Sequence, residues 1–178
     1  KIHGGILAKR KKNLHMKEIN ELGIVGIDIV VNNLYPFQET ISDKNVLFQE
    51  VLENIDIGGP AMTRAAAKNF EDVLIIVDSE DYDNVGKILL SGKVDYKLRR
   101  YLASKAFRHT AFYDTLVANF LSNTDTNLKF PNYITSAWEL KKIPRYGENP
   151  HQKSAVYKFP NETGGIVNAE KLHGIEMS

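Results

Sequence analysis

The chain has 178 residues, of which 43% are hydrophobic, and its 23 lysines and arginines nearly balance its 22 aspartates and glutamates. This length suffices for one domain, or for one domain and part of a second. The net charge of +1 argues against a protein that binds nucleic acid or a membrane surface. The absence of cysteine excludes disulfides, thiolate catalysis and cysteine metal sites, and it fits a cytoplasmic location. No apolar stretch approaches the roughly 20 residues of a membrane span.

The first half of the chain is predicted to alternate strands and helices. Residues 27–31 are β-branched and mostly apolar, which predicts a strand buried on both faces of a parallel sheet. Residues 32–37 lead out of this strand as a loop. Residues 43–54 are predicted to form a helix, and 73–77 a second buried strand. Since ligands of open α/β sheets bind beyond the carboxyl ends of strands, residues 32–37 are candidates for ligand contact.

The second half is predicted to be mainly helical and then irregular. Residues 81–90 form a helix that Gly92 stops, and 95–121 form a long helix. The apolar stripe of this long helix contains Leu98, Leu102, Ala106, His109, Tyr113, Leu116 and Phe120. Residues 122–132 are interpreted as a connector, and 138–143 as a strand. Strands that alternate with helices indicate a layered α/β fold.

The most informative feature is an acidic glycine turn that runs directly into a helix. Asp56 precedes Gly58 and Gly59, where a bare backbone allows a ligand to approach closely. The free N–H groups at the start of the following helix favour an anion or a developing oxyanion. Arg64 and Lys68 are four residues apart, so both cations project from one face of this helix. Together these residues predict part of an active site.

Each candidate also has a simpler structural interpretation. Asp56 could merely cap a turn, although its neighbours favour a functional role. Lys68 could complement the helix dipole. Spacing alone favours packing of the Tyr35 ring on Phe37. His109 lies on the apolar stripe, where a core histidine with satisfied hydrogen bonds is the expected role.

Two further observations bear on ligands. The five histidines form no ligand cluster with the spacing of a metal site, so no metal is assigned. Residues 145–152 place several polar side chains between two prolines, at Pro144 and Pro150. So dense a polar set is unsuited to a core, which predicts a loop that contacts a ligand.

At this point the chain resembles a known family. Taken together and in order, six segments resemble the bifunctional purine biosynthesis enzymes, aminoimidazole carboxamide ribonucleotide (AICAR) formyltransferase/IMP cyclohydrolase. These segments are KIHGGILA (1–8), VNNLYPF (31–37), IDIGGP (55–60), RAAAKN (64–69), KAFRHTA (105–111) and RYGENPHQ (145–152).

The resemblance implies two domains. Residues 1–130 are expected to be most of a cyclohydrolase domain, an α/β fold with a methylglyoxal-synthase-like layered parallel sheet and flanking helices. Residues 131–178 are expected to be a connector and the first elements of a cytidine-deaminase-like transformylase domain. The family's first segment would precede Lys1, and the transformylase core would follow Ser178. We therefore expect a piece of a longer protein with little or no activity by itself.

The resemblance also implies the roles of particular residues. Lys68 corresponds to the catalytic lysine of the family, and Asp56 and Tyr35 to its companions around the closing ring. Asn32, Asn33, Asp56 and Ile57 match positions that hold the nucleotide, and Arg145 and Tyr146 match substrate contacts of the transformylase site. The glycine turn and its helix add Gly58, Gly59 and Arg64 as candidates for substrate binding.

The implied reaction is closure of 5-formamidoimidazole-4-carboxamide ribonucleotide (FAICAR) to IMP with loss of water. The resemblance implies no cofactor for this step, and 10-formyltetrahydrofolate as the co-substrate of the transformylase. A purine ribonucleotide substrate and a homodimer are also implied, without nucleic acid or membrane partners. The alternative is an allosteric nucleotide- or metabolite-binding module of the same fold. Such a module has no use for Tyr35, Asp56 and Lys68 together.

Overall fold

The computed structural model describes residues 1–124 and 130–174. It confirms a mixed α/β fold with a small parallel sheet. Strand β1 (Ile29–Val31) pairs in parallel with β2 (Leu74–Ile76), with Val30 opposite Ile75. The predicted strands are thus real, although each is shorter than its apolar run.

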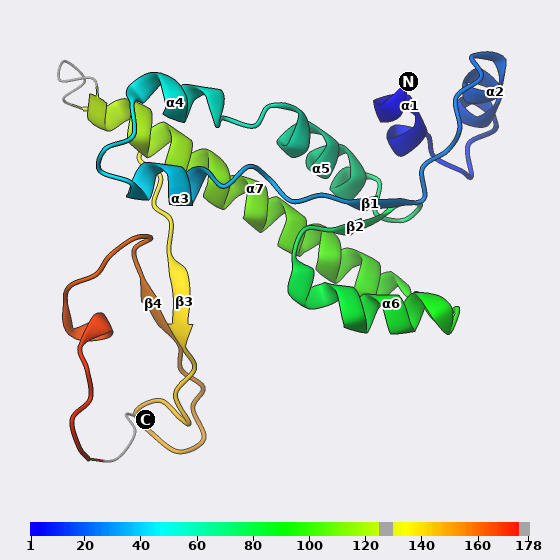
Figure 1. The fold of residues 1–178 in the computed structure, drawn as a ribbon. Helices are drawn as coiled ribbons and strands as arrows, with labels where there is room; N and C mark the ends of the chain where they lie inside the picture. Colours follow the sequence, from blue (N-terminus) through cyan, green and yellow to red (C-terminus); the bar gives the residue numbers. More distant parts are fainter. Residues whose placement is uncertain (125–129, 175–178) are drawn as a thin grey trace.

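The long helix α7 runs diagonally through the helical part of the molecule, with α4 and α5 above it and α6 below its first half (Figure 1). The helices are α1 (Ile2–Leu7), α2 (Asn13–Glu21), α3 (Phe37–Ser42), α4 (Phe48–Glu53), α5 (Gly58–Lys68), α6 (Tyr82–Leu90) and α7 (Tyr96–Thr124), with 3₁₀ turns η1 (Ser79–Asp81) and η2 (Ile166–Asn168).

The predicted apolar stripe of α7 supports two successive hydrophobic clusters. Near its start, Leu102 and Ala106 are buried against β2 and α5. Farther along, Tyr113 and Leu116 pack in a second cluster with Phe37, Val51 and Ala137. A single amphipathic helix therefore organises most of the core.

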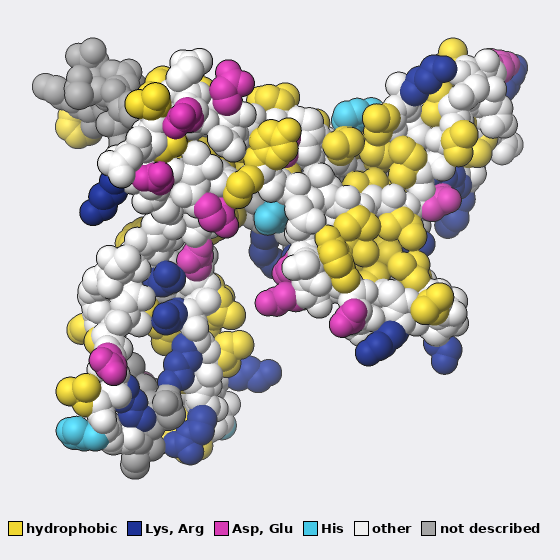
Figure 2. Space-filling view, viewed as in Figure 1, with side chains coloured by type: hydrophobic (Ala, Val, Ile, Leu, Met, Phe, Trp, Pro, Cys, Tyr) yellow, Lys and Arg dark blue, Asp and Glu magenta, His cyan; other side chains and the backbone are white. Residues whose placement is uncertain are grey.

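The burial predicted for β1 is wrong. Ile29 and Val31 are 43% and 55% exposed, whereas all three residues of β2 are buried. Ile29 and Val31 are two residues apart, so both lie on the same face of the sheet, and this face is exposed at β1. Hydrophobic side chains accordingly gather on the surface over the strands and α6 (Figure 2). A strand's composition does not determine how many neighbours cover it.

The helix predicted over 43–54 is shorter than expected, and the short helix α3 precedes it, beginning at the last residue of the expected loop, Phe37. The Asp43 carboxylate accepts a hydrogen bond from Asn45 N at 2.9 Å, which favours a turn at this point. Leu47 N donates to the Glu50 carboxylate at 3.2 Å, so α4 begins only at Phe48.

After α7 the chain forms an antiparallel hairpin that extends away from the helices (Figure 1). Strand β3 (Glu139–Lys142) confirms the strand expected over 138–143, and it pairs with β4 (Val156–Lys158). Gln38 Nε2 on α3 donates to Glu139 Oε1 at 2.5 Å, which ties the hairpin to the helices.

The predicted connector over 122–132 lies partly outside the described residues, and its first residues belong to α7 instead. Within 1–124 and 130–174, no helix is both long and apolar enough to cross a membrane.

Candidate functional site

The turn before α5 is held together through the carboxylate of Asp56. Oδ1 accepts a hydrogen bond from Gly59 N at 2.8 Å, and Oδ2 lies 3.4 Å from Tyr35 N. Asp56 N donates to the Tyr113 hydroxyl at 2.8 Å, and this hydroxyl donates to Asn54 O at 3.1 Å. Asp56 therefore does cap the turn, as its simpler interpretation predicted. Its carboxylate also joins the loop after β1 to the start of α5, and its backbone N–H joins the turn to α7 through Tyr113.

The two glycines of the turn have different surroundings. A Cβ on Gly59 would collide with Asp56 Oδ2 and would lie 2.8 Å from Leu34 Cδ2. A Cβ on Gly58 would meet nothing within 4 Å. The bare backbone of Gly59 thus makes room for Asp56 itself, while Gly58 and the neighbouring Ile57 are open to solvent. Within this turn, the backbone is open to a ligand at Ile57 and Gly58.

The asparagines after β1 are both hydrogen-bonded. Asn32 Nδ2 donates to Gly59 O at 2.9 Å and to Thr63 Oγ1 at 2.8 Å, so this amide links β1 to α5. Asn33 Oδ1 accepts from the Tyr82 hydroxyl at 2.8 Å. The donors of Asn32 are thus used within the protein, whereas the amide nitrogen of Asn33 has no hydrogen-bond partner among residues 1–124 and 130–174.

Tyr35 does not pack on Phe37 as its spacing suggested. The Phe37 ring is buried against Tyr113 and Phe120, with ring centroids 5.7 and 6.0 Å away. Tyr35 is 56% exposed and lines a cavity of about 210 Å³ together with Asn33. The Phe37 ring is therefore part of the second hydrophobic cluster, whereas the Tyr35 ring is accessible to a ligand.

The cations of α5 lie away from the Asp56 carboxylate. Arg64 and Lys68 are exposed, and the Arg64 guanidinium lies 5.7 Å from the centre of the Phe107 ring. Ten residue steps separate Gly58 from Lys68, or about 15 Å along the helix axis. Asp56 and Lys68 are therefore at opposite ends of α5, and this conformation does not bring them together.

Arg145 and Tyr146 lie in the loop between β3 and β4, at the far end of the hairpin from the helices (Figure 1). The Arg145 guanidinium is 5.6 Å from the centre of the Tyr146 ring. The loop is closed by Gly147 N donating to Gln152 O and by Ser154 Oγ donating to Tyr146 O, both at 2.8 Å. These two candidates form a site separate from the Asp56 turn.

Sequence reasoning missed an ion-pair cluster at the end of β2. Lys105 Nζ lies 2.6 Å from Asp78 Oδ2 and 2.8 Å from Asp81 Oδ2. Burial acts to lower the pKa of Lys105, but the two carboxylates outweigh it and raise that pKa above its usual range. The hydrogen bond from Lys105 lowers the pKa of Asp78. An aspartate directly after a buried strand was the available signal for this cluster.

The interpretation of His109 as a satisfied core histidine is wrong. Its Nε2 is buried and has no hydrogen-bond partner within the described part of the chain. Burial also lowers the pKa of this imidazole, which favours the neutral form. His109 follows Lys105 by four residues, and this helical spacing was the signal that could have linked it to the ion-pair cluster.

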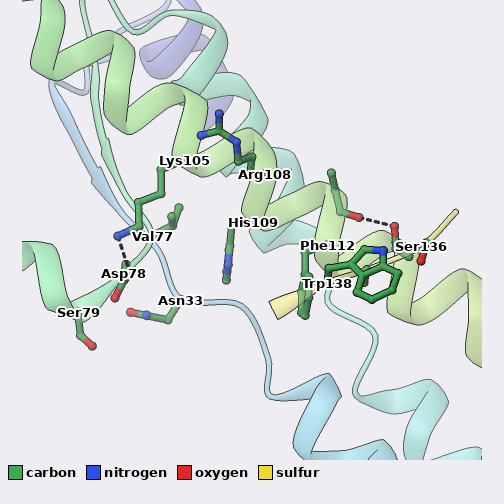
Figure 3. Close-up of a pocket in the computed structure, with 13 residues that line it drawn as sticks. Asn33, Val77, Asp78, Ser79, Lys105, Arg108, His109, Phe112, Ser136 and Trp138 are labelled. Atoms are coloured by element: carbon green, nitrogen blue, oxygen red, sulfur yellow. Dashed lines mark hydrogen bonds and ion pairs between the residues drawn. The ribbon is translucent and has the colours of Figure 1, made fainter. Parts of the chain in front are cut away.

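Asp78, Lys105 and His109 line a cavity of about 620 Å³ between the ends of the strands, α7 and residues 136–138 (Figure 3). Lys105 reaches Asp78, and His109 projects from the same helix between Lys105 and Phe112 (Figure 3). Asn33, His109 and Phe112 also line the smaller cavity, so they separate the two hollows. No group of three potential His, Asp or Glu metal ligands occurs in the described residues.

Comparison with known proteins relates these features to one family. The chain is 53% identical over its whole length to the bifunctional purine biosynthesis protein PurH of Thermoanaerobacter sp. (strain X514). It is 51% identical over 99% of its length to PurH of Bacillus subtilis (strain 168). In both comparisons the chain spans 35% of the relative's length, about a third.

The fold agrees with a solved structure, described as the crystal structure of ForH. The TM-score is 0.57 at 42% identity, with 67% of this chain and 62% of that chain covered. The family model described as AICARFT/IMPCHase bienzyme matches residues 66–178, which is more than half of the sequence. The chain therefore belongs to the AICARFT/IMPCHase bienzyme family.

Proposed function

We propose that the protein containing this chain closes FAICAR to IMP, and that its second domain formylates AICAR with 10-formyltetrahydrofolate. The observation that carries the proposal is membership of the AICARFT/IMPCHase bienzyme family. The names of the relatives, which are bifunctional purine biosynthesis proteins, support both activities. We also propose that this protein is a homodimer located in the cytoplasm.

The proposed domain division places the cyclohydrolase in residues 1–130 and the start of the transformylase in 131–178. It is supported by the two separate sheets, one parallel and one antiparallel. We propose a methylglyoxal-synthase-like layout for the first domain and a cytidine-deaminase-like layout for the second. The Arg145 and Tyr146 loop belongs to the second domain and would contact the AICAR substrate there.

In the proposed cyclohydrolase step, the carboxamide nitrogen of FAICAR attacks the formyl carbon of the same molecule. Holding the two groups in contact supplies much of the rate, because no second reactant has to be captured. Asp56 Oδ1 is anchored by Gly59 N, while Oδ2 has only the longer 3.4 Å contact with Tyr35 N. Oδ2 is therefore the oxygen positioned to accept the amide proton.

Tyr35 and Lys68 complete the proposal. The exposed Tyr35 ring follows Asn33 on the loop bonded to Asp56, so its hydroxyl can assist the departure of water. Lys68 would stabilise negative charge. Its position about 15 Å from the start of α5 requires it to act on a different part of the bound nucleotide from Asp56. Asn33, Gly58 and the remaining predicted contacts would hold the nucleotide between these ends.

The test uses the full-length protein with the substitution Asp56→Asn, which keeps the shape of the side chain but removes the proton acceptor. A fall of about 10²- to 10⁴-fold in the cyclohydrolase kcat is expected. Formylation of AICAR in the same preparation is the control and is expected to stay unchanged. An unchanged cyclohydrolase kcat would exclude Asp56 as the base. Lys68→Ala, measured in parallel, tests the lysine separately.

A further inference from the structure

The larger cavity occupies a place where α/β proteins bind ligands. Asn33 follows β1 and Asp78 and Ser79 follow β2, so the cavity opens beyond the carboxyl ends of both parallel strands. Its volume of about 620 Å³ lies within the range typical of small-molecule sites. Asp56, Gly58 and Gly59 do not line it, so it is distinct from the glycine turn.

The charged residues that line the cavity are Lys105, Arg108 and Asp78. Lys105 is bound by the carboxylates of Asp78 and Asp81, so it offers little net attraction to an anion. The neutral polar residues of the lining include Asn33 and His109, with the hydroxyl residues Ser79, Thr115 and Ser136. The Tyr82 hydroxyl fixes Asn33 Oδ1 as an acceptor, which leaves the amide nitrogen as a donor. These groups suit a neutral ligand edge that both donates and accepts hydrogen bonds.

His109 provides the most specific feature. An unpaired buried polar atom destabilises a protein, so a partner for Nε2 would be stabilising. His109 lines both hollows, so a ligand in the larger one would lie beside this side chain. A hydrogen-bonding ligand there would replace the missing partner.

The remaining wall is aromatic. Trp138 lines the cavity and stays 50% exposed, although Phe159 packs against its ring with the centroids 3.9 Å apart. Phe112 lies beside His109 at the same opening (Figure 3). A planar ring could stack on Trp138 while its edge meets His109 and Asn33. A nucleobase combines such a stacking face with a donor and acceptor edge.

We propose that this cavity binds the base of a mononucleotide, with the ring stacked on Trp138 and its edge hydrogen-bonded to His109. The site is additional to the proposed cyclohydrolase site and does not depend on it. Its only residue in common with the predicted nucleotide contacts is Asn33.

Because Trp138 is the single tryptophan of the chain, its fluorescence reports directly on the cavity. The chain is titrated with AMP, and with ribose 5-phosphate as the control that lacks a base. A saturable fluorescence change is expected with AMP alone. Calorimetry of Trp138→Ala with AMP is expected to show binding at least about 5-fold weaker, from the loss of stacking.

His109→Phe keeps a planar ring but removes both nitrogens, and about 5- to 10-fold weaker AMP binding is expected. His109→Gln restores a hydrogen-bonding group and should recover part of this loss. Circular dichroism of each variant confirms that it is folded. The proposal is overturned if ribose 5-phosphate gives the same change, if AMP gives none that saturates, or if folded His109→Phe binds AMP like the parent.

Asp56→Asn separates this proposal from the cyclohydrolase. The variant is expected to keep the AMP-dependent fluorescence change in the chain, whatever its effect on the cyclohydrolase of the full-length protein. Loss of that change in a folded Asp56→Asn chain would show that AMP occupies the glycine-turn site instead, and would overturn the separate site.

Discussion

Replacing Gly59 with alanine is expected to disrupt the Asp56 turn, whereas the same change at Gly58 is not. The two glycines are adjacent and both belong to the first turn of α5, so they form a matched pair. A Cβ on Gly59 would overlap Asp56 Oδ2, lie 2.9 Å from Asp56 Cγ and press on Leu34. A Cβ on Gly58 would point into open space.

The size of the effect follows from the hydrogen bond that has to break. To clear the new Cβ, the Asp56 carboxylate must move as a unit, and its 2.8 Å bond to Gly59 N is lost. A hydrogen bond to a charged group contributes about 1.5–3 kcal/mol. Alanine in a helix recovers about 0.5–1 kcal/mol relative to glycine. Gly59→Ala should therefore destabilise by about 1–2 kcal/mol, and Gly58→Ala should be neutral or slightly stabilising.

Urea unfolding of the two variants and the parent measures these differences, provided that the slopes of the transitions agree. In the full-length protein, Gly59→Ala should also lower the cyclohydrolase rate, because the carboxylate proposed as the base has moved. Equal free energies of unfolding for Gly58→Ala and Gly59→Ala would refute the claim that the turn depends on close packing at Gly59.

Three other outcomes are expected. Tyr113→Phe removes the hydroxyl that accepts from Asp56 N and donates to Asn54 O, so thermal unfolding should show a loss of about 1–3 kcal/mol. Burial lowers the pKa of His109, so the imidazole binds a proton more readily in the unfolded chain than in the folded one. The free energy of unfolding should therefore fall as the pH drops below about 6.5, and it should fall less in His109→Phe. In the full-length protein, Arg145→Ala should raise the KM for AICAR at the formylation step and leave the cyclohydrolase unchanged, as parallel assays of both activities would show.

Local patterns predicted much of this fold. The stripe of α7 is visible in the sequence because helical periodicity directly sets which side chains face the core. The buried strand β2 and the glycine turn before α5 are likewise local signals. The hydrogen bond from Gly59 N to Asp56 follows from residues only three apart.

Features that depend on distant neighbours could not be predicted in this way. The exposure of Ile29 and Val31 depends on what covers their face of the sheet, which no local pattern encodes. The unpaired His109 depends on groups brought from other elements. The separation of Asp56 from Lys68, by contrast, was available from sequence, since an uninterrupted helix of known length fixes the distance between its ends.

Helix α7 passes through both hydrophobic clusters without a break. If one cluster unfolds, the part of α7 that packs in it loses its support. The backbone hydrogen bonds of a continuous helix form cooperatively, so the part of α7 in the other cluster is destabilised as well. We expect both halves of the core to melt in one transition, and hydrogen exchange to report similar protection at Leu102 and at Leu116.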